Sequence, residues 1–147
     1  VLINTSSGFS PAWQRMRPGA WPRVLRLLGR QELFDRERDI LRLTSNREIP
    51  LSLAKQWYSI QRQRPVTPRN AVNQLAAAAR YKPGKKRPMS DALLLASRGD
   101  RIVHWRCSAA LEERWQWTMK LHADAGHDLP LDEPEWIIQQ LRNWLPR

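Results

Sequence analysis

Two polar side chains each follow a short apolar segment, at a point where a parallel strand would end. Asp100 comes after the apolar run 92–97, and His127 comes after the segment 117–123. In an open parallel sheet, reactive side chains gather just beyond the C-terminal ends of the strands. A carboxylate beside an imidazole at that edge can serve as the orienting acid and the general base of a nucleophilic relay. Asp100 and His127 are therefore the candidate catalytic pair.

Both residues also have a purely structural interpretation. Gly99 and Asp100 form a common turn pair, in which the Asp side chain binds nearby backbone. His127 follows Gly126 in a loop ahead of a helix, where an imidazole often contacts only backbone or solvent. Their joint placement at two matching strand ends favours the catalytic interpretation.

Other polar side chains make weaker candidates. His104 and His122 have no cysteine or carboxylate at a ligand spacing in the sequence, so we expect neither a metal site nor a cofactor. Asp128 is expected to serve a turn, and Asp132 to cap the last helix. Cys107 lies on an apolar stripe, so we expect it to be packed rather than nucleophilic.

The pair needs strands to position it, and three segments have strand character. Residues 1–5 and 92–97 are nearly continuous apolar runs, typical of parallel strands that are covered on both faces, so both are expected to lie centrally. Residues 117–123 alternate apolar with polar side chains, which predicts a half-exposed edge strand.

Almost ninety residues between the first two strands have helical apolar spacing. One stripe spans residues 21–28 and ends at Gly29, a second spans 53–60, and a third spans 72–79 with Thr67 as its N-cap. This region is predicted to be an all-helical insertion. An exposed loop over 82–88 then returns the chain to the sheet.

Two more apolar stripes, at 103–111 and 137–145, predict helices after the second and third strands. The resulting order predicts an α/β fold with a three-stranded parallel sheet. Three strands are few for a sheet covered on both faces. Because the chain also starts with Val1 rather than Met, we expect a missing upstream part, or a second copy, to complete the sheet.

The charge of the chain is uneven. The net charge is +11, yet residues 1–90 hold 18 Lys and Arg against 5 Asp and Glu, while residues 91–147 hold 7 against 9. Clustered cations can attract nucleic acid, an anionic membrane or an acidic protein. The cations lack the aromatic and glycine pattern of a base-stacking module, so we expect a solvated helical face rather than nucleic acid binding.

Composition also bears on the compartment. No stretch approaches the roughly 18 apolar residues of a membrane span. The single cysteine excludes an internal disulfide framework and fits a reducing compartment. We expect a cytoplasmic protein.

At the level of motifs, LLLASRGDRIV at Leu93–Val103 and ADAGHDLPLDEPEW at Ala123–Trp136 resemble the closing half of the α/β-hydrolase superfamily. In that family the acid follows the penultimate core strand and the histidine follows the last strand. The resemblance implies that Asp100 is the triad acid and His127 the general base. It also implies a core strand at 1–5, a helical cap with its return loop at 6–90, and a C-terminal core at 91–147.

The family's nucleophile lies in a G-x-S-x-G elbow, and that pattern does not occur in these 147 residues. The resemblance therefore implies an esterase-like hydrolase, present here as a fragment that is inactive alone and acts on a small ester once completed. Ser6, Ser7 and Ser10 lack an elbow helix and are not expected to be nucleophiles.

Two questions stay open at this point. The aromatic residues of the insertion could form its own core, which we favour, or line an acyl pocket under a cap; they are Trp13, Trp21, Trp57 and Tyr58. The alternative to an enzyme is a non-catalytic module that dimerises through its open strand and presents a basic helical surface, possibly to nucleic acid.

Overall fold

A computed structural model describes residues 1–145, and its sheet has three parallel strands. The strands are β1 (Leu2–Ile3), β2 (Leu93–Ser97) and β3 (Thr118–His122), in the order β1, β2, β3. The α/β class, the central place of β2 and the edge place of β3 were all predicted. The central place expected for β1 is wrong within the described residues, because β1 pairs only with β2.

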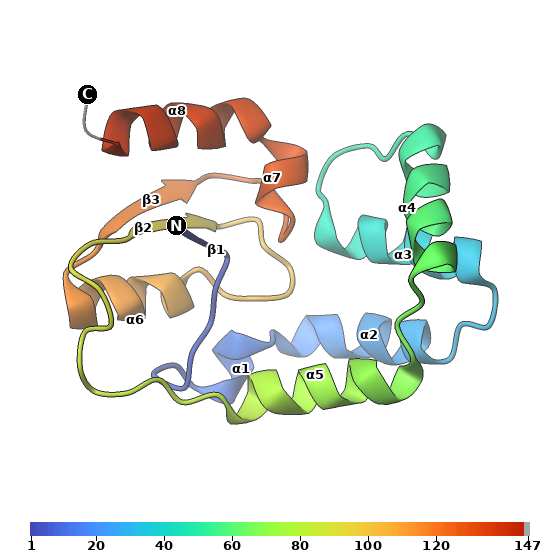
Figure 1. The fold of residues 1–147 in the computed structure, drawn as a ribbon, viewed down its shortest axis with the longest axis horizontal. Coiled ribbons are helices and arrows are strands. Elements are labelled where there is room, and N and C mark those ends of the chain that lie inside the picture. Colours follow the sequence, from blue (N-terminus) through green and yellow to red (C-terminus); the bar gives the residue numbers. More distant parts are fainter. Residues whose placement is uncertain (146–147) are drawn as a thin grey trace.

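Two helices cover the two faces of the sheet (Figure 1): α6 (Arg106–Trp115) and α8 (Pro134–Trp144). Successive residues of β2 point to opposite faces, so the buried strand contributes to two clusters. Leu94 packs with Leu111 and Trp115 on the α6 side. Leu93 and Leu95 pack on the α8 side with Ala125, Leu129 and Ile137. Cover on both faces accounts for the uninterrupted apolar run of β2.

The alternation of β3 has the expected result. Met119 and Leu121 are half-buried, whereas Thr118 and Lys120 are exposed. Met119 packs against the cluster on the α6 side. One face of this edge strand therefore meets the core while the other meets solvent.

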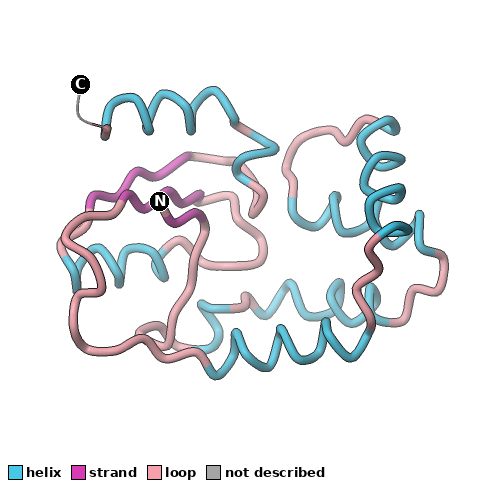
Figure 2. The backbone as a smooth tube through the Cα atoms, viewed as in Figure 1, coloured by secondary structure: helices cyan, strands magenta, loops and turns pink. Residues whose placement is uncertain are grey.

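The region between β1 and β2 is helical, and Figure 2 shows its helices gathered away from the strands. The helices are α1 (Ala12–Arg15), α2 (Trp21–Leu28), α3 (Leu33–Thr44), α4 (Leu51–Gln63) and α5 (Pro68–Arg80), with a 3₁₀ turn at Pro18–Ala20. The predicted N-cap of α5 is confirmed, because the Thr67 side chain accepts a hydrogen bond from the Asn70 amide at 3.2 Å. Gly29 follows the last residue of α2, as expected.

The insertion buries little of its apolar surface. No residue of α1, α2 or α5 is buried, and Trp13 and Trp21 are each about half exposed. The expectation that these two tryptophans form a core is therefore wrong: their helices have too few neighbours within residues 1–145. Tyr58 is half-buried and meets Phe34 edge to face, with ring centroids 5.8 Å apart.

Among the described helices, none is both long enough and apolar enough for a membrane crossing.

Candidate functional site

Asp100 and His127 lie in contact at one edge of the sheet. The register pairs Ser97 with His122, so β2 and β3 end together and the two loops that follow lie side by side. The His127 Nδ1 lies 2.8 Å from the Asp100 Oδ2, which is a charge-assisted hydrogen-bond distance. The Asp100 carboxylate is 1% exposed, whereas the His127 side chain is 33% exposed. The acid is thus shielded behind an accessible imidazole.

The second carboxylate oxygen of Asp100 holds the acid in place. Asp100 Oδ1 accepts hydrogen bonds from the amides of Ile102 at 2.7 Å and Val103 at 3.0 Å. Arg17 from the insertion donates to the Asp100 carbonyl at 2.6 Å. The turn role and the role beside His127 therefore coexist, because each uses a different oxygen of the same side chain.

The pair has the geometry of an acid–base relay. With Nδ1 donating to Asp100, Nε2 of His127 carries a lone pair and can accept a proton from a hydroxyl. The neighbouring carboxylate would stabilise the imidazolium that results. Within residues 1–145, no serine, threonine or cysteine side chain is hydrogen bonded to the His127 ring.

The serines after β1 do not supply the missing hydroxyl. Ser7 is buried and its Oγ accepts from the Phe9 amide at 3.4 Å, while Ser10 is buried and its Oγ has no hydrogen-bond partner among the described residues. Among the described residues, neither serine is hydrogen bonded to the His127 ring, in line with the sequence argument against a nucleophilic role.

Asn4, which the sequence did not single out, ties the first strand to the site. Its side chain donates to the carbonyls of Gly126 at 3.1 Å and His127 at 2.7 Å, and accepts from the Ser97 amide at 2.9 Å. Its φ of 44° lies in the left-handed region, which Asn tolerates better than most residues. The sequence signal that could have identified this residue is a polar Asn directly after an apolar strand.

The loop that carries Asp100 (the acid loop) and the loop that carries His127 (the histidine loop) also approach each other closely through their backbones. The Ser97 Oγ donates to the Ala125 carbonyl at 2.6 Å. A Cβ at position 99 would lie only 2.3 Å from the Asp124 carbonyl oxygen, so only glycine fits there. Gly99 is thus required by the closeness of the two loops.

Asp132 does not cap the last helix, which corrects the sequence expectation. It is the last residue of the short helix α7 (Leu129–Asp132), and its carboxylate turns inward to the Gly126 amide, at 2.6 Å. The cap position of α8 is Glu133, without a side-chain cap bond. Asp128 precedes α7, as expected of a turn residue, and also makes no side-chain cap bond.

His122 has carboxylate neighbours that its sequence spacing did not indicate. Its Nδ1 lies 3.4 Å from Asp124 Oδ1 and its Nε2 lies 3.8 Å from Glu133 Oε2. Arg47 from the insertion forms ion pairs with both carboxylates and lowers the pKa of Asp124 through its hydrogen bond. One guanidinium thus pairs with both acids, so the group forms an ion-pair cluster.

His104 and Cys107 have the environments of structural residues. Burial lowers the pKa of His104, and the charges of Arg17 and Arg106 lower it further. Burial raises the pKa of the Cys107 thiol, which disfavours the nucleophilic thiolate. Cys107 is fully buried, as its place on an apolar stripe predicted.

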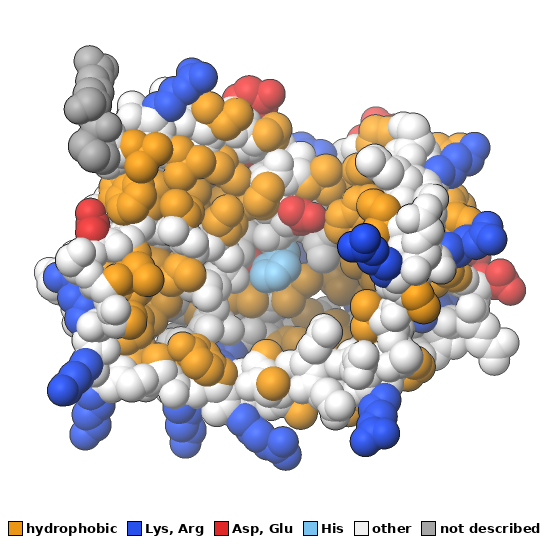
Figure 3. Space-filling view, in the orientation of Figure 1, with side chains coloured by type: hydrophobic (Ala, Val, Ile, Leu, Met, Phe, Trp, Pro, Cys, Tyr) orange, Lys and Arg blue, Asp and Glu red, His pale blue; other side chains and the backbone are white. Residues whose placement is uncertain are grey.

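An apolar pocket of about 160 Å³ lies within the insertion. Its lining includes Trp21 from α2 and Leu75 from α5, and also Ser6, which follows Asn4 by two residues. Figure 3 shows a hollow beside a histidine on one face of the molecule, with hydrophobic side chains around it. An accessible imidazole and exposed apolar surface occur together on this face, a combination found in sites for apolar small molecules.

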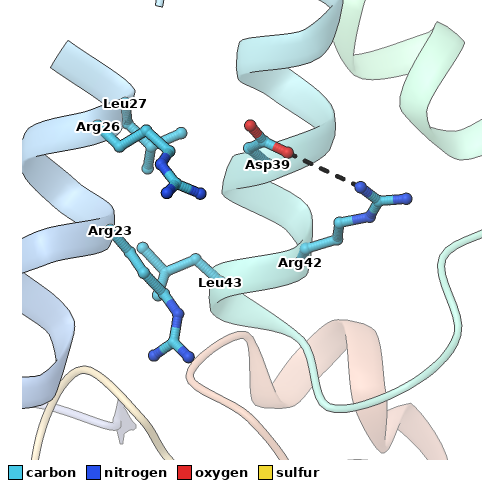
Figure 4. Close-up of a pocket in the computed structure, with 6 residues that line it drawn as sticks. All are labelled: Arg23, Arg26, Leu27, Asp39, Arg42 and Leu43. Atoms are coloured by element: carbon cyan, nitrogen blue, oxygen red, sulfur yellow. Dashed lines mark ion pairs between the residues drawn. The ribbon is translucent and has the colours of Figure 1, made fainter. Parts of the chain in front are cut away.

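A second hollow, between α2 and α3, is basic. It is lined by Arg23, Arg26, Leu27, Asp39, Arg42 and Leu43. Figure 4 shows the three guanidinium groups pointing in different directions, and Asp39 already pairs with Arg30 at 3.1 Å. The arginines therefore do not converge on one anion, and this hollow is not the candidate site.

In its fold, the chain resembles solved structures of proteins that are named as a lipase, a hydrolase and an esterase. The chain superposes with a TM-score of 0.66 on a protein assigned as a lipase from Acinetobacter baumannii AYE, at 16% identity over 97% of this chain and 50% of that one. It superposes equally well on 2-hydroxy-6-oxo-6-phenylhexa-2,4-dienoate hydrolase from Rhodococcus sp. strain RHA1, at 17% identity over 97% and 53%. A protein assigned as an aryl esterase from Burkholderia cenocepacia gives 0.66 at 22%, over 97% and 52%.

These comparisons show the fold of the chain. The chain spans about half the length of each of the three proteins. Neither a family model nor a curated protein matches the sequence.

Proposed function

Because the chain has the α/β-hydrolase fold, we propose that it is the acid- and histidine-bearing half of a hydrolase that cleaves carboxylic esters by acyl transfer. The observation that carries the proposal is the 2.8 Å contact between a buried Asp100 carboxylate and a His127 imidazole that is one third exposed. A serine supplied from upstream of Val1 would be the nucleophile, and the chain alone would be inactive.

The proposed reaction assigns one role to each residue. His127 Nε2 takes the proton of the serine hydroxyl as its oxygen attacks the ester carbonyl, and later gives that proton to the leaving alkoxide. Water then hydrolyses the acyl-enzyme, with His127 again as the base. Asp100 keeps the imidazole oriented and stabilises its charged form, but does not itself take up the proton.

The proposal gives the rest of the chain a place. Residues 1–5 and 91–147 would belong to the catalytic core and residues 6–90 to a cap over the nucleophile. The half-exposed tryptophans and the apolar pocket of the insertion would then face the acyl group. The missing sheet would pair along the free side of β1. The cytoplasmic location expected from the single cysteine stays a prediction.

The alternative of a non-catalytic module makes a different use of the same surfaces. It gives no reason for a buried carboxylate to be aligned with an accessible imidazole, which would be chance in a dimerising protein. We therefore favour the hydrolase.

The test uses the protein extended by the residues encoded upstream of Val1. We expect turnover of p-nitrophenyl butyrate, and a loss of about 10³-fold or more in kcat for His127→Ala. His122→Ala is the matched control, since this histidine lies outside the pair, and should retain most activity. An upstream segment with Gly or Ala in place of the elbow serine, or equal rates in the two variants, would contradict the proposal.

A further inference from the structure

The connection between α3 and α4 lies against both loops of the candidate pair. The Asn46 side chain donates one hydrogen bond to the Gly99 carbonyl at 2.9 Å and another to the Asp124 carbonyl at 2.7 Å. Gly99 precedes the acid, and Asp124 belongs to the loop that carries His127. One amide group of the insertion therefore joins the acid loop to the histidine loop.

Asp132 joins the same connection to the residue before His127. Its Oδ2 accepts hydrogen bonds from the backbone amides of Gly126, at 2.6 Å, and Asn46, at 2.8 Å. Its Oδ1 accepts from the Ser45 hydroxyl. Asp132 is only 8% exposed. A buried carboxylate is costly unless its oxygens are satisfied, so these donors must stay together for the loop to remain folded.

Further close contacts restrict movement of this connection relative to the two loops. A Cβ at position 126 would lie 2.3 Å from the Thr44 carbonyl oxygen, and that same oxygen accepts from the Asp128 amide at 2.9 Å. On the acid side, Arg101 donates to the carbonyls of Arg42, at 2.6 Å, and Ser45. A displacement of this connection would therefore shift both loops.

We propose that residues 45–47 and Asp132 form a positioning device that holds His127 against Asp100, so that the placement of the helical insertion controls the pair. Asn46 and Asp132 are the positioning residues. Neither touches the imidazole or the Asp100 carboxylate in the described contacts, and both act through the backbone of the two loops. This inference rests on the proposed function, in which the pair is the acid–base relay.

The amide of Asn46 offers a discriminating substitution. Asn46→Asp keeps the size and shape of the side chain but replaces the NH₂ donor by an oxygen that faces two carbonyl oxygens. A packing role would tolerate this change, whereas the bridging role requires the donor. Asn46→Ala removes the bridge without adding a charge.

Asp132 offers a loss and a rescue. Asp132→Ala leaves the backbone amides of Gly126 and Asn46 without their acceptor. Asp132→Asn keeps one acceptor oxygen for these amides and can donate its NH₂ to the Ser45 hydroxyl. We therefore expect the Asn variant to retain much of what the Ala variant loses.

The measurement is made on this chain by NMR, without any ester turnover. The imidazole Nδ1 proton that is hydrogen bonded to a buried carboxylate should give a low-field signal, assigned to His127 by its loss in His127→Ala. We expect the signal to disappear in Asn46→Asp and Asp132→Ala, to weaken in Asn46→Ala and to persist in Asp132→Asn. Thr67→Ala, which removes the distant cap of α5, is the control and should keep it.

Amide signals of β2 in the same spectra show whether each variant is folded. If Asn46→Asp prevents folding, the two alanine variants decide the question. A folded Asn46→Asp or Asp132→Ala variant with an unchanged low-field signal overturns the positioning role and leaves the proposed function intact. A wild-type chain without that signal overturns both, because the pair itself is then not formed.

Discussion

The sheet with its two helices and the helical insertion are stabilised in different ways. Leu93, Leu94 and Leu95 of β2 are fully buried between two layers of helix, so the core is held by apolar packing on both faces. The insertion buries few side chains, and its contacts with the core include the polar contacts of residues 45–47 and of Arg17. The comparison indicates that apolar burial in the core supplies most of the stability. The insertion is held by a few hydrogen bonds, and residues 1–145 leave much of its apolar surface exposed.

The largest expected effect contrasts two apolar truncations. Leu94→Ala removes a fully buried side chain and should lower the free energy of unfolding by about 2–5 kcal/mol. Val72→Ala in α5 removes a side chain that is 54% exposed and should change it by no more than about 0.5 kcal/mol. Urea denaturation measures both. Similar losses for the two variants would break the comparison.

A backbone contact between the two regions gives the next effect. Gly126→Ala places a Cβ 2.3 Å from the Thr44 carbonyl oxygen, which the fold can accept only by moving the insertion. We expect a loss of about 1–3 kcal/mol in urea denaturation. Gly84→Ala is the matched control, because a Cβ at that position meets nothing within 4 Å. Equal stability of the two variants would show that the approach of Thr44 is not tight.

A helix cap tests whether the insertion opens independently of the core. Thr67→Ala removes the side-chain acceptor of the Asn70 amide and should cost about 1 kcal/mol. If the two regions differ as described, hydrogen exchange should accelerate in α5 and stay unchanged in β2. Uniform acceleration in both elements would mean that the molecule opens as one unit.

The smallest expected effect depends on pH. Burial raises the pKa of Glu37 above its ordinary value of 4.5, in spite of the neighbouring Arg36. The folded carboxyl therefore binds its proton more tightly than the unfolded one, so its favourable contribution is present below the ordinary pKa and is lost as pH rises through the raised value.

Ionised Glu37 thus opposes folding at neutral pH. We expect Glu37→Gln to increase the free energy of unfolding at pH 7. It should have no effect below pH ~4, where the Glu37 carboxyl holds its proton in both the folded and the unfolded state. Urea denaturation at the two pH values checks this. A variant that is less stable at pH 7 would mean that the ion pair with Arg36 outweighs burial.

The parts of the site that were predictable from sequence are those with a local signal. Asp100 and His127 each follow a strand whose apolar pattern is visible in a few consecutive residues, and the end of a parallel strand is a known place for chemistry. Thr67 was likewise visible as an N-cap before a proline.

The supporting residues were not predictable, because their contacts join distant parts of the chain. Asn46 lies 53 residues from Gly99, and Asn4 lies 123 residues from His127, so neither belongs to a periodic pattern. Asp132 has the sequence position of a capping residue before a helix, yet its carboxylate accepts hydrogen bonds from tertiary contacts instead. The apolar stripes of the insertion predicted helices but could not show that their faces would stay open.

The role of His127 as the base of an upstream serine is tested most directly by labelling the upstream-extended protein with a fluorophosphonate, which reacts with a serine only where a base activates it. We expect one adduct by mass spectrometry, on a serine upstream of Val1, with labelling slowed strongly by His127→Ala and not by His122→Ala. Labelling at an unchanged rate in His127→Ala, or no adduct on the extended protein, would contradict this role.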